Sequence, residues 1–222
     1  MVSVAAAMRR RSLWTTRNGI VLALAIVSSA IAWWLIAWPV LTLSNTENHA
    51  GHFALTFAHV VGGTGMLALG GLNLYLAAIK SHYPLHRRIG QSYLAFGVFG
   101  SLVAIAITLT MAHKVAGTSV FTNVTVSLLT LALAWLAFAG LGWRAGRNRR
   151  FQSHGQWMIR SYVLAWSFVF CRIASRFSAI DDVANGEAFI WLSWVGPLII
   201  CELILQWPEG ARKAQANRRS VT

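Results

Sequence analysis

Six long apolar stretches run through this chain of 222 residues and constrain its fold more than any other feature. A helix that crosses the hydrocarbon core of a bilayer needs about 20 residues. Because a backbone in lipid must satisfy its own hydrogen bonds, these stretches are predicted to be helices rather than strands. We therefore expect an all-α protein, a polytopic membrane bundle of six transmembrane helices with no room for a soluble domain. The predicted spans lie near 20–41, 53–79, 89–112, 120–143, 156–178 and 188–206.

Basic residues gather in alternate loops of the predicted bundle. Of the 19 Lys and Arg residues, 15 lie before the first span, between the second and third, between the fourth and fifth, or after the sixth. The positive-inside rule therefore predicts an inner-membrane domain over 19–207, with the basic segment 1–18 and the basic tail 208–222 both in the cytoplasm. The cationic loops would meet anionic lipid headgroups. A chain that is 56% hydrophobic is no soluble nucleic-acid-binding protein, despite its formal charge of +13.

Ionisable residues inside the spans are the first candidates for function, because each is costly in lipid. Arg160 and Glu202 each lie about 6 Å from the cytoplasmic ends of the fifth and sixth spans, so these antiparallel helices can pair them. The pair is either a structural clasp, which we favour, or a catalytic or proton-carrying site. Arg172 lies about 9 Å inside the outer end of the fifth span. Its guanidinium would suit a carboxylate or phosphate, or it could extend outward to lipid headgroups or pair with Asp181 and Asp182.

Two helix faces combine a histidine with small residues. Helical spacing puts these residues on one face of each helix. Small residues on a membrane helix usually allow another helix to approach closely. The alternative is a flat cofactor beside the histidine, and the sequence leaves both open. The second span carries His59, Gly63, Met66, Gly70 and Asn73, and the third carries His86, Gly90, Tyr93, Gly97 and Gly100.

The histidines fall at two levels of the predicted bundle. His59 and His113 lie toward the outside, and His86 and His154 lie toward the cytoplasm. Haem iron in b-type cytochromes takes neutral imidazoles from facing helices, so these four are candidate haem-iron ligands. Any haem would be non-covalent, because the chain has no C-x-x-C-H motif. Arg160 and Arg172 would then hold propionates or a substrate anion.

Three motifs carry a family resemblance: PLHRRIGQSYL from Pro84, HGQWMIRSYVLAW from His154, and WLSWVGPLIICELIL from Trp191. With the second span, they resemble the bacterial predicted membrane proteins of the domain-of-unknown-function family numbered 2306, over roughly residues 50 to 206. The resemblance implies a membrane architecture and a set of motif positions, but no reaction. The matching positions are His59, His86, Arg87, Gly90, Tyr93, His154, Met158, Arg160, Ser161, Tyr162, Arg172 and Glu202.

The chain is less closely similar to the ascorbate-reducible transmembrane b-type cytochromes. Those are six-helix proteins with haem histidines on four successive central helices, whereas the fourth span here has no histidine. A single haem, or none, remains compatible with this departure.

The sequence thus predicts a membrane oxidoreductase that passes electrons to or from a quinol through b haem. The alternative is a non-redox protein: a small-solute or proton transporter, or a lipid-binding accessory protein.

Overall fold

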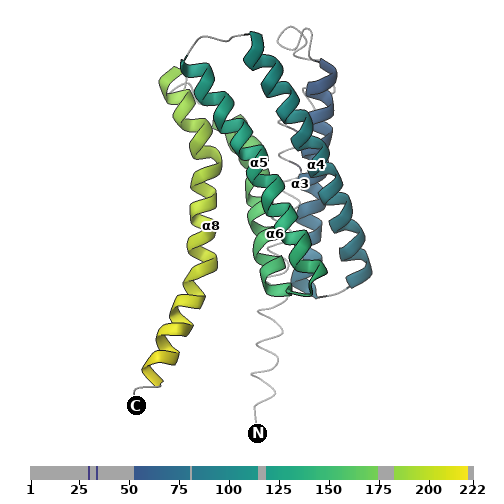
Figure 1. Ribbon diagram of the computed structural model, residues 1–222. Helices are drawn as coiled ribbons and strands as arrows, with labels where there is room; N and C mark the ends of the chain where they lie inside the picture. Colours follow the sequence, from purple (N-terminus) through teal and green to yellow (C-terminus); the bar gives the residue numbers. More distant parts are fainter. Residues whose placement is uncertain are drawn as a thin grey trace. The chain divides into compact units, whose positions relative to one another are not determined.

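Every element that the structure describes is an α-helix (Figure 1). The computed structural model describes the backbone of residues 53–80, 82–114, 119–174 and 183–219, and the single positions 30 and 34. The side chains along the helices are described over 53–80, 82–111, 123–171 and 187–206. The all-α class is therefore confirmed. The helices are α3 (Phe53–Ile79), α4 (Tyr83–Lys114), α5 (Ser119–Arg147), α6 (Phe151–Ala165), α7 (Ser167–Ala174) and α8 (Val183–Arg219).

Four of these helices contain candidate membrane spans, by length and composition. They correspond to the second, third, fourth and sixth predicted spans. Apart from positions 30 and 34, the first predicted span, 20–41, lies outside the described residues, and the fifth comprises the shorter α6 and α7. Six spans and the orientation of the termini therefore stay predictions. The candidate spans are Phe53–Ile79, Tyr83–Met111, Asn123–Arg147 and Glu187–Gln206.

The chain divides into two compact units, Met1–Ile107 and Thr108–Thr222, with the boundary inside α4. In the first unit, α3 and α4 form an antiparallel hairpin joined by a tight turn. Lys80 and His82 both have positive φ, at 50° and 54°, which reverses the chain within a few residues. Pro84 lies in the first turn of α4, where its missing N–H breaks no helical hydrogen bond. Met66, Leu67, Leu76 and Tyr93 are buried in this unit.

In the second unit, α5, α6 and α8 pack against one another, and α7 packs against α6 and α8. The helix α8 runs in the same direction as α5 and opposite to α6 (Figure 1). The core side chains of the second unit come from α5, α6, α7 and α8. They include Leu131, Trp135, Ala139, Leu164, Val169 and Trp194.

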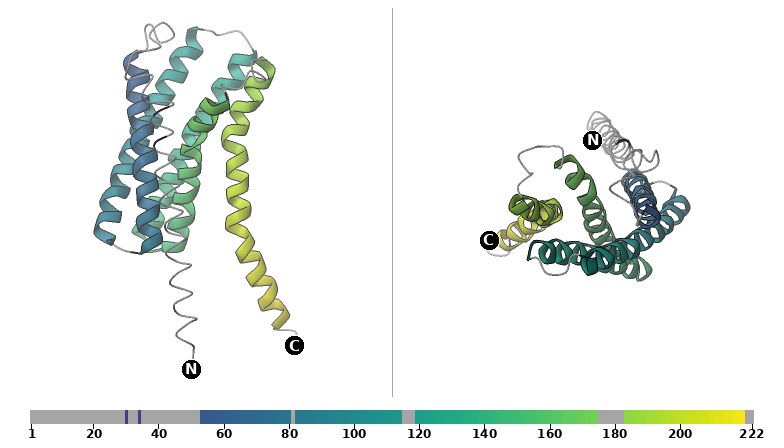
Figure 2. Two further views of the ribbon diagram at one scale, coloured as in Figure 1. Left: turned by 180° about the vertical axis from the view of Figure 1, so that it is seen from behind. Right: turned by 90° about the horizontal axis from the view of Figure 1, so that it is seen from above.

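The predicted fifth span is not one regular helix but is interrupted at Trp166, between α6 and α7. Figure 2 draws this part of the chain in green. The Trp166 N–H donates to the carbonyl of Val163, three residues back, over 3.2 Å. The Val169 N–H likewise donates three residues back, to Trp166 O over 3.0 Å, and the ordinary four-residue spacing returns with the Phe170 N–H, which donates to the same carbonyl over 3.1 Å. The interruption is therefore a short stretch of the 3₁₀ kind.

One side of α8 carries exposed apolar side chains. Such a surface suits a helix that faces lipid tails, which are as apolar as leucine itself. The same helix turns Ser193, Trp194 and Cys201 inward. The exposed residues are Leu192, Ile199, Ile200, Leu203 and Ile204.

Candidate functional site

Two histidines join α3 to α4, one toward each end of the hairpin. His59 on α3 donates from Nδ1 to the Gly100 carbonyl on α4, over 3.2 Å. His86 on α4 donates from Nδ1 to the Asn73 carbonyl on α3, over 3.3 Å. Both bonds fit one antiparallel register, because the two bonding residues of each helix are 14 residues apart. On α3 they are His59 and Asn73, and on α4 they are His86 and Gly100. At 1.5 Å per residue, the two contacts are about 21 Å apart along the hairpin.

The close approach of α3 and α4 depends on glycine. A Cβ added at Gly62 would lie 2.8 Å from Gly100 Cα, which is closer than real Cβ atoms come. A Cβ at Gly65 would lie 2.5 Å from the Phe96 ring. Gly62 and Gly65 therefore serve helix packing, and they lie beside the face with Gly63 for which the sequence left packing and a cofactor open. Gly63 differs, because a Cβ there would meet no atom within 4 Å.

Asn73 is the buried polar residue of this hairpin. Its side chain is 9% exposed, and it lies against Gly90 on α4. A Cβ at Gly90 would come within 3.0 Å of Asn73 Nδ2. Asn73 Oδ1 is buried and accepts no hydrogen bond from the described part of the chain. Asn73, His86 and Gly90 thus form one cluster near the turn between α3 and α4.

The third described histidine joins α5 to α6. His154 donates from Nδ1 to the Gly142 carbonyl on α5, over 2.8 Å. A Cβ at Gly146 would lie 2.9 Å from His154 Nδ1, and one at Gly142 would lie 2.7 Å from Met158 Sδ. Gly142 and Gly146 form a G-x-x-x-G pair that receives the α6 residues His154 and Met158. The sequence interpretation missed this pair, although its spacing is a known signal for close membrane-helix packing.

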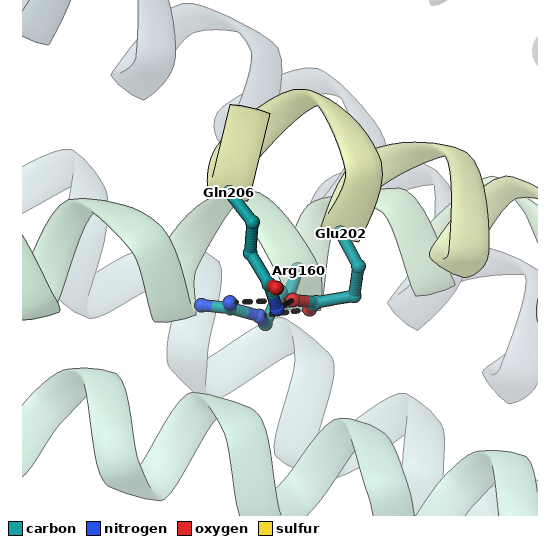
Figure 3. A network of polar contacts seen from close by, with 3 residues as sticks. All are labelled: Arg160, Glu202 and Gln206. Carbon is teal, nitrogen blue, oxygen red and sulfur yellow. Dashed lines mark hydrogen bonds and ion pairs between the residues drawn. The ribbon is translucent and has the colours of Figure 1, made fainter. Parts of the chain in front are cut away.

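Arg160 on α6 and Glu202 on α8 form an ion pair (Figure 3). Arg160 Nε donates to Glu202 Oε1, and Nη2 donates to Oε2 over 2.9 Å. Gln206, one turn further along α8, donates to the same Oε2 over 3.1 Å. The Arg160 guanidinium also lies 4.8 Å from the centre of the Trp157 ring. A bidentate bond, a second donor and an aromatic face hold this pair in one geometry.

Two further polar links of the second unit were missed by sequence reasoning. Trp194 Nε1 on α8 donates to Ser127 Oγ on α5 over 3.1 Å, and both side chains are buried. Asn123 on α5 donates to Glu187 on α8 over 3.0 Å. Serine and asparagine opposite a neighbouring helix are a weak sequence signal, because the rotation of each helix decides which residues meet.

Several predicted site residues are not brought together by the structure. The side chains of His113 and Arg172 lie outside the described residues. His86 belongs to the first unit and His154 to the second, so their predicted pairing is not tested. Among the residues searched, which are the described ones, no three His, Cys, Asp or Glu side chains gather as a metal-binding group.

The histidine bonds have a chemical consequence. A carbonyl can only accept, so the Nδ1 of His59, His86 and His154 must carry the hydrogen. In the neutral ring the lone pair then lies on Nε2. All three imidazoles are thereby in the tautomer that ligates a metal through Nε2.

One known protein family matches the part of the chain that contains these residues. The profile of the family described as "Predicted membrane protein (DUF2306)" matches residues 56–205, which is more than half of the chain. That range includes all of the described histidines and the Arg160–Glu202 pair. No curated protein and no solved structure matches the chain. The chain therefore belongs to the DUF2306 family of predicted membrane proteins.

Proposed function

We propose that this multi-pass membrane protein binds b-type haem non-covalently and carries electrons between a membrane quinol and an acceptor. One observation carries the proposal: His59, His86 and His154 each donate Nδ1–H to a main-chain carbonyl of a neighbouring helix. In metal-binding histidines, such a bond fixes the orientation of the ring and raises the basicity of Nε2. Bound haem would supply a one-electron iron couple.

The donor set suits haem better than a hard metal ion. Neutral imidazole is a ligand of haem iron, whereas magnesium and calcium take oxygen ligands. Arg160 already uses Nε and Nη2 to bind Glu202. We therefore propose Arg172 as the propionate partner, and Arg160 as the group that orients α6 against α8.

The proposal favours two haem sites, one at each of the two histidine levels. His59 and His86 lie about 21 Å apart along the hairpin, so they would serve different irons. Two ligands of one iron each come within about 2 Å of it. His113 and His154 are the candidate second ligands of the two levels. Such a pair of sites would carry electrons across the membrane rather than along one face.

The test is the absorption spectrum of the purified protein. The full chain is expressed with haem supplementation, purified in detergent and recorded before and after dithionite reduction. We expect a Soret band and an α band in the reduced-minus-oxidised difference. A protein that folds, as judged by circular dichroism, but shows neither band would overturn the proposal.

A second function is favoured by the Arg160–Glu202 pair, since an intramembrane ion pair is costly and commonly has a task. The protein would then be a proton-coupled transporter in which Glu202 exchanges a proton. Proteoliposomes that contain a pH-sensitive dye would show proton uptake, and Glu202→Gln would abolish it without unfolding the protein. Equal uptake by the wild type and the variant would refute this function.

A further inference from the structure

The cluster of Asn73, His86 and Gly90 contains a buried acceptor that the fold does not use. Asn73 is 9% exposed, and its Oδ1 accepts no hydrogen bond within the described residues. A buried polar atom without a partner is costly, and native proteins contain few of them. A leucine would fill similar space at no such cost. The presence of an amide at this position therefore calls for a reason.

Two other buried polar side chains bond to their own helix, whereas Thr125 Oγ1 and Ser167 Oγ are, like Asn73 Oδ1, buried atoms without a hydrogen bond in the described part of the chain. Ser161 donates to Met158 O over 2.9 Å, and Ser193 donates to Ile190 O over 2.7 Å. Asn73 instead extends across to α4, where Gly90 leaves room for its amide. A Cβ at Gly90 would lie 3.0 Å from Nδ2 and 3.9 Å from Oδ1. The glycine thus keeps the amide in place without supplying a donor to its oxygen.

The neighbouring histidine already serves the other oxygen of Asn73. His86 Nδ1 donates to the main-chain carbonyl of Asn73 over 3.3 Å, so only the side-chain oxygen of this residue is left without a donor among the described residues. A molecule that binds at Asn73 Oδ1 therefore meets an acceptor and must bring a hydrogen-bond donor. Simple acceptors, such as the carbonyl oxygens of a quinone, would gain nothing from Asn73 Oδ1.

The depth of the cluster restricts what the donor can be. Asn73 lies six residues before the end of α3, which is about 9 Å along the helix. Free cations are costly at that depth in an apolar span. Flat aromatic rings with a polar group, by contrast, prefer the border between headgroups and hydrocarbon. A hydroxyl on a lipophilic aromatic ring fits both conditions.

We infer that the cluster binds a hydroquinone, whose ring hydroxyl donates a hydrogen bond to Asn73 Oδ1. Such a molecule reaches the cluster through the membrane and presents its hydroxyl to the buried acceptor. The inference deepens the proposed function and rests on it for the fate of the electrons. The binding itself needs no haem, and it discriminates the reduced form from the oxidised form of the same ring.

The experiment compares the two redox forms of one probe. The detergent-purified full chain is dialysed to equilibrium, without oxygen, against a short-tailed benzoquinone or against its hydroquinone. The wild type should bind the hydroquinone about tenfold more tightly, because only that form satisfies the buried oxygen. Asn73→Leu should remove the preference, and Gly90→Ala should reduce it by displacing the amide. Asn123→Leu, which changes an exposed asparagine in the other unit, should leave it unchanged.

Each alternative outcome gives a decision. Equal affinities of the wild type for the two forms would overturn the inference, and this is the result expected if a water molecule alone satisfies Asn73. An undiminished preference in Asn73→Leu would also overturn it. If that variant fails to fold, an undiminished preference in Gly90→Ala decides the matter in the same way. Haem binding is scored separately: a preference without a Soret band refutes the proposed function alone, and a Soret band without a preference refutes this inference alone.

Discussion

His154 on α6 donates to the main-chain carbonyl of Gly142 on α5 over 2.8 Å, and its ring lies directly against Gly146. The His154 ring therefore fills the space left by Gly146, while Met158 lies against Gly142, and the bond fixes the register of the α5–α6 hairpin. The same bond sets its tautomer. Because the ring packs against a glycine, its packing can be perturbed by substituting that glycine while the imidazole itself is left unchanged.

Gly146→Ala tests the packing role of His154. The new Cβ would lie 2.9 Å from His154 Nδ1, so the ring must move. Overpacking of this kind typically costs 1–3 kcal/mol, and we expect a loss of about 2 kcal/mol in the free energy of unfolding, measured by denaturant titration in detergent. Gly155→Ala on α6 is the control, because a Cβ there meets nothing within 4 Å. That variant should be neutral or slightly more stable, and an equal loss in both variants would count against the packing of His154 on Gly146.

Gly62→Ala and Gly63→Ala are neighbours with opposite expected effects. A Cβ at Gly62 would lie 2.8 Å from the Gly100 backbone, which cannot yield as a side chain would. The helices α3 and α4 must then separate, with an expected loss of about 3 kcal/mol. At Gly63 there is open space, so alanine should gain about 0.5 kcal/mol from its better helix propensity. Thermal unfolding of the two variants side by side measures the difference, and similar midpoints would contradict it.

The helix positions were largely predictable from the sequence, because long apolar runs in lipid have no alternative to the helix. The predicted span 53–79 coincides with α3. The third predicted span begins at 89, whereas the helix α4 begins at Tyr83, because hydropathy marks the edge of the hydrocarbon and not the end of the helix. For the same reason α8 continues past the predicted 206 to Arg219. The irregular turn at Trp166 could not be predicted in this way, because no Pro or Gly lies near it in the sequence.

The sequence predicted how far along its helix each residue of the candidate site lies, but it did not predict how each helix is rotated about its own axis. Arg160 and Glu202 could be matched because each lies at the same distance from a helix end. The contacts His154–Gly142 and Trp194–Ser127 depend on how each helix is turned about its axis. That rotation is set by packing of the complete bundle, so one helix's pattern does not contain it. Glycine spacing was the usable signal, and it was read on α3 and α4 but overlooked on α5.

The Arg160–Glu202 pair should stabilise the contact between α6 and α8. Its side chains are 12% and 32% exposed, so removing one charge leaves the other poorly solvated. We expect Arg160→Gln and Glu202→Gln each to cost about 2 kcal/mol, and the double variant to cost less than the sum of the two. Unfolding titrations of all four proteins give the coupling energy. Gln206→Leu removes one exposed hydrogen bond and should cost at most about 0.5 kcal/mol; additive single effects would show that the pair is not coupled.

Arg149 in the turn after α5 has a conformation that glycine adopts more easily. Its φ is 57°, and the Arg150 N–H donates to Ala145 O over 2.9 Å, which completes a Schellman turn. Arg149→Gly should therefore stabilise the protein by about 1 kcal/mol, because side chains with a Cβ are strained there. Arg150→Gly removes the same charge at a φ of −86° and should be neutral or destabilising. Midpoints of thermal unfolding compare the two, and an equal rise in both would attribute the effect to charge.

If the proposed function holds, one part of the bound haem should depend on His59 and the other part on His86. Because about 21 Å of helix separates their contacts, they belong to different irons, and neither can replace the other. His59→Ala and His86→Ala should each lose about half of the haem per protein, as measured by the pyridine haemochrome spectrum, and the double variant should lose nearly all of it. His82→Ala is the matched control, because that residue is exposed in the turn between α3 and α4. Complete loss in either single variant would instead indicate one haem, and would leave the second histidine with the packing role that its carbonyl bond already gives it.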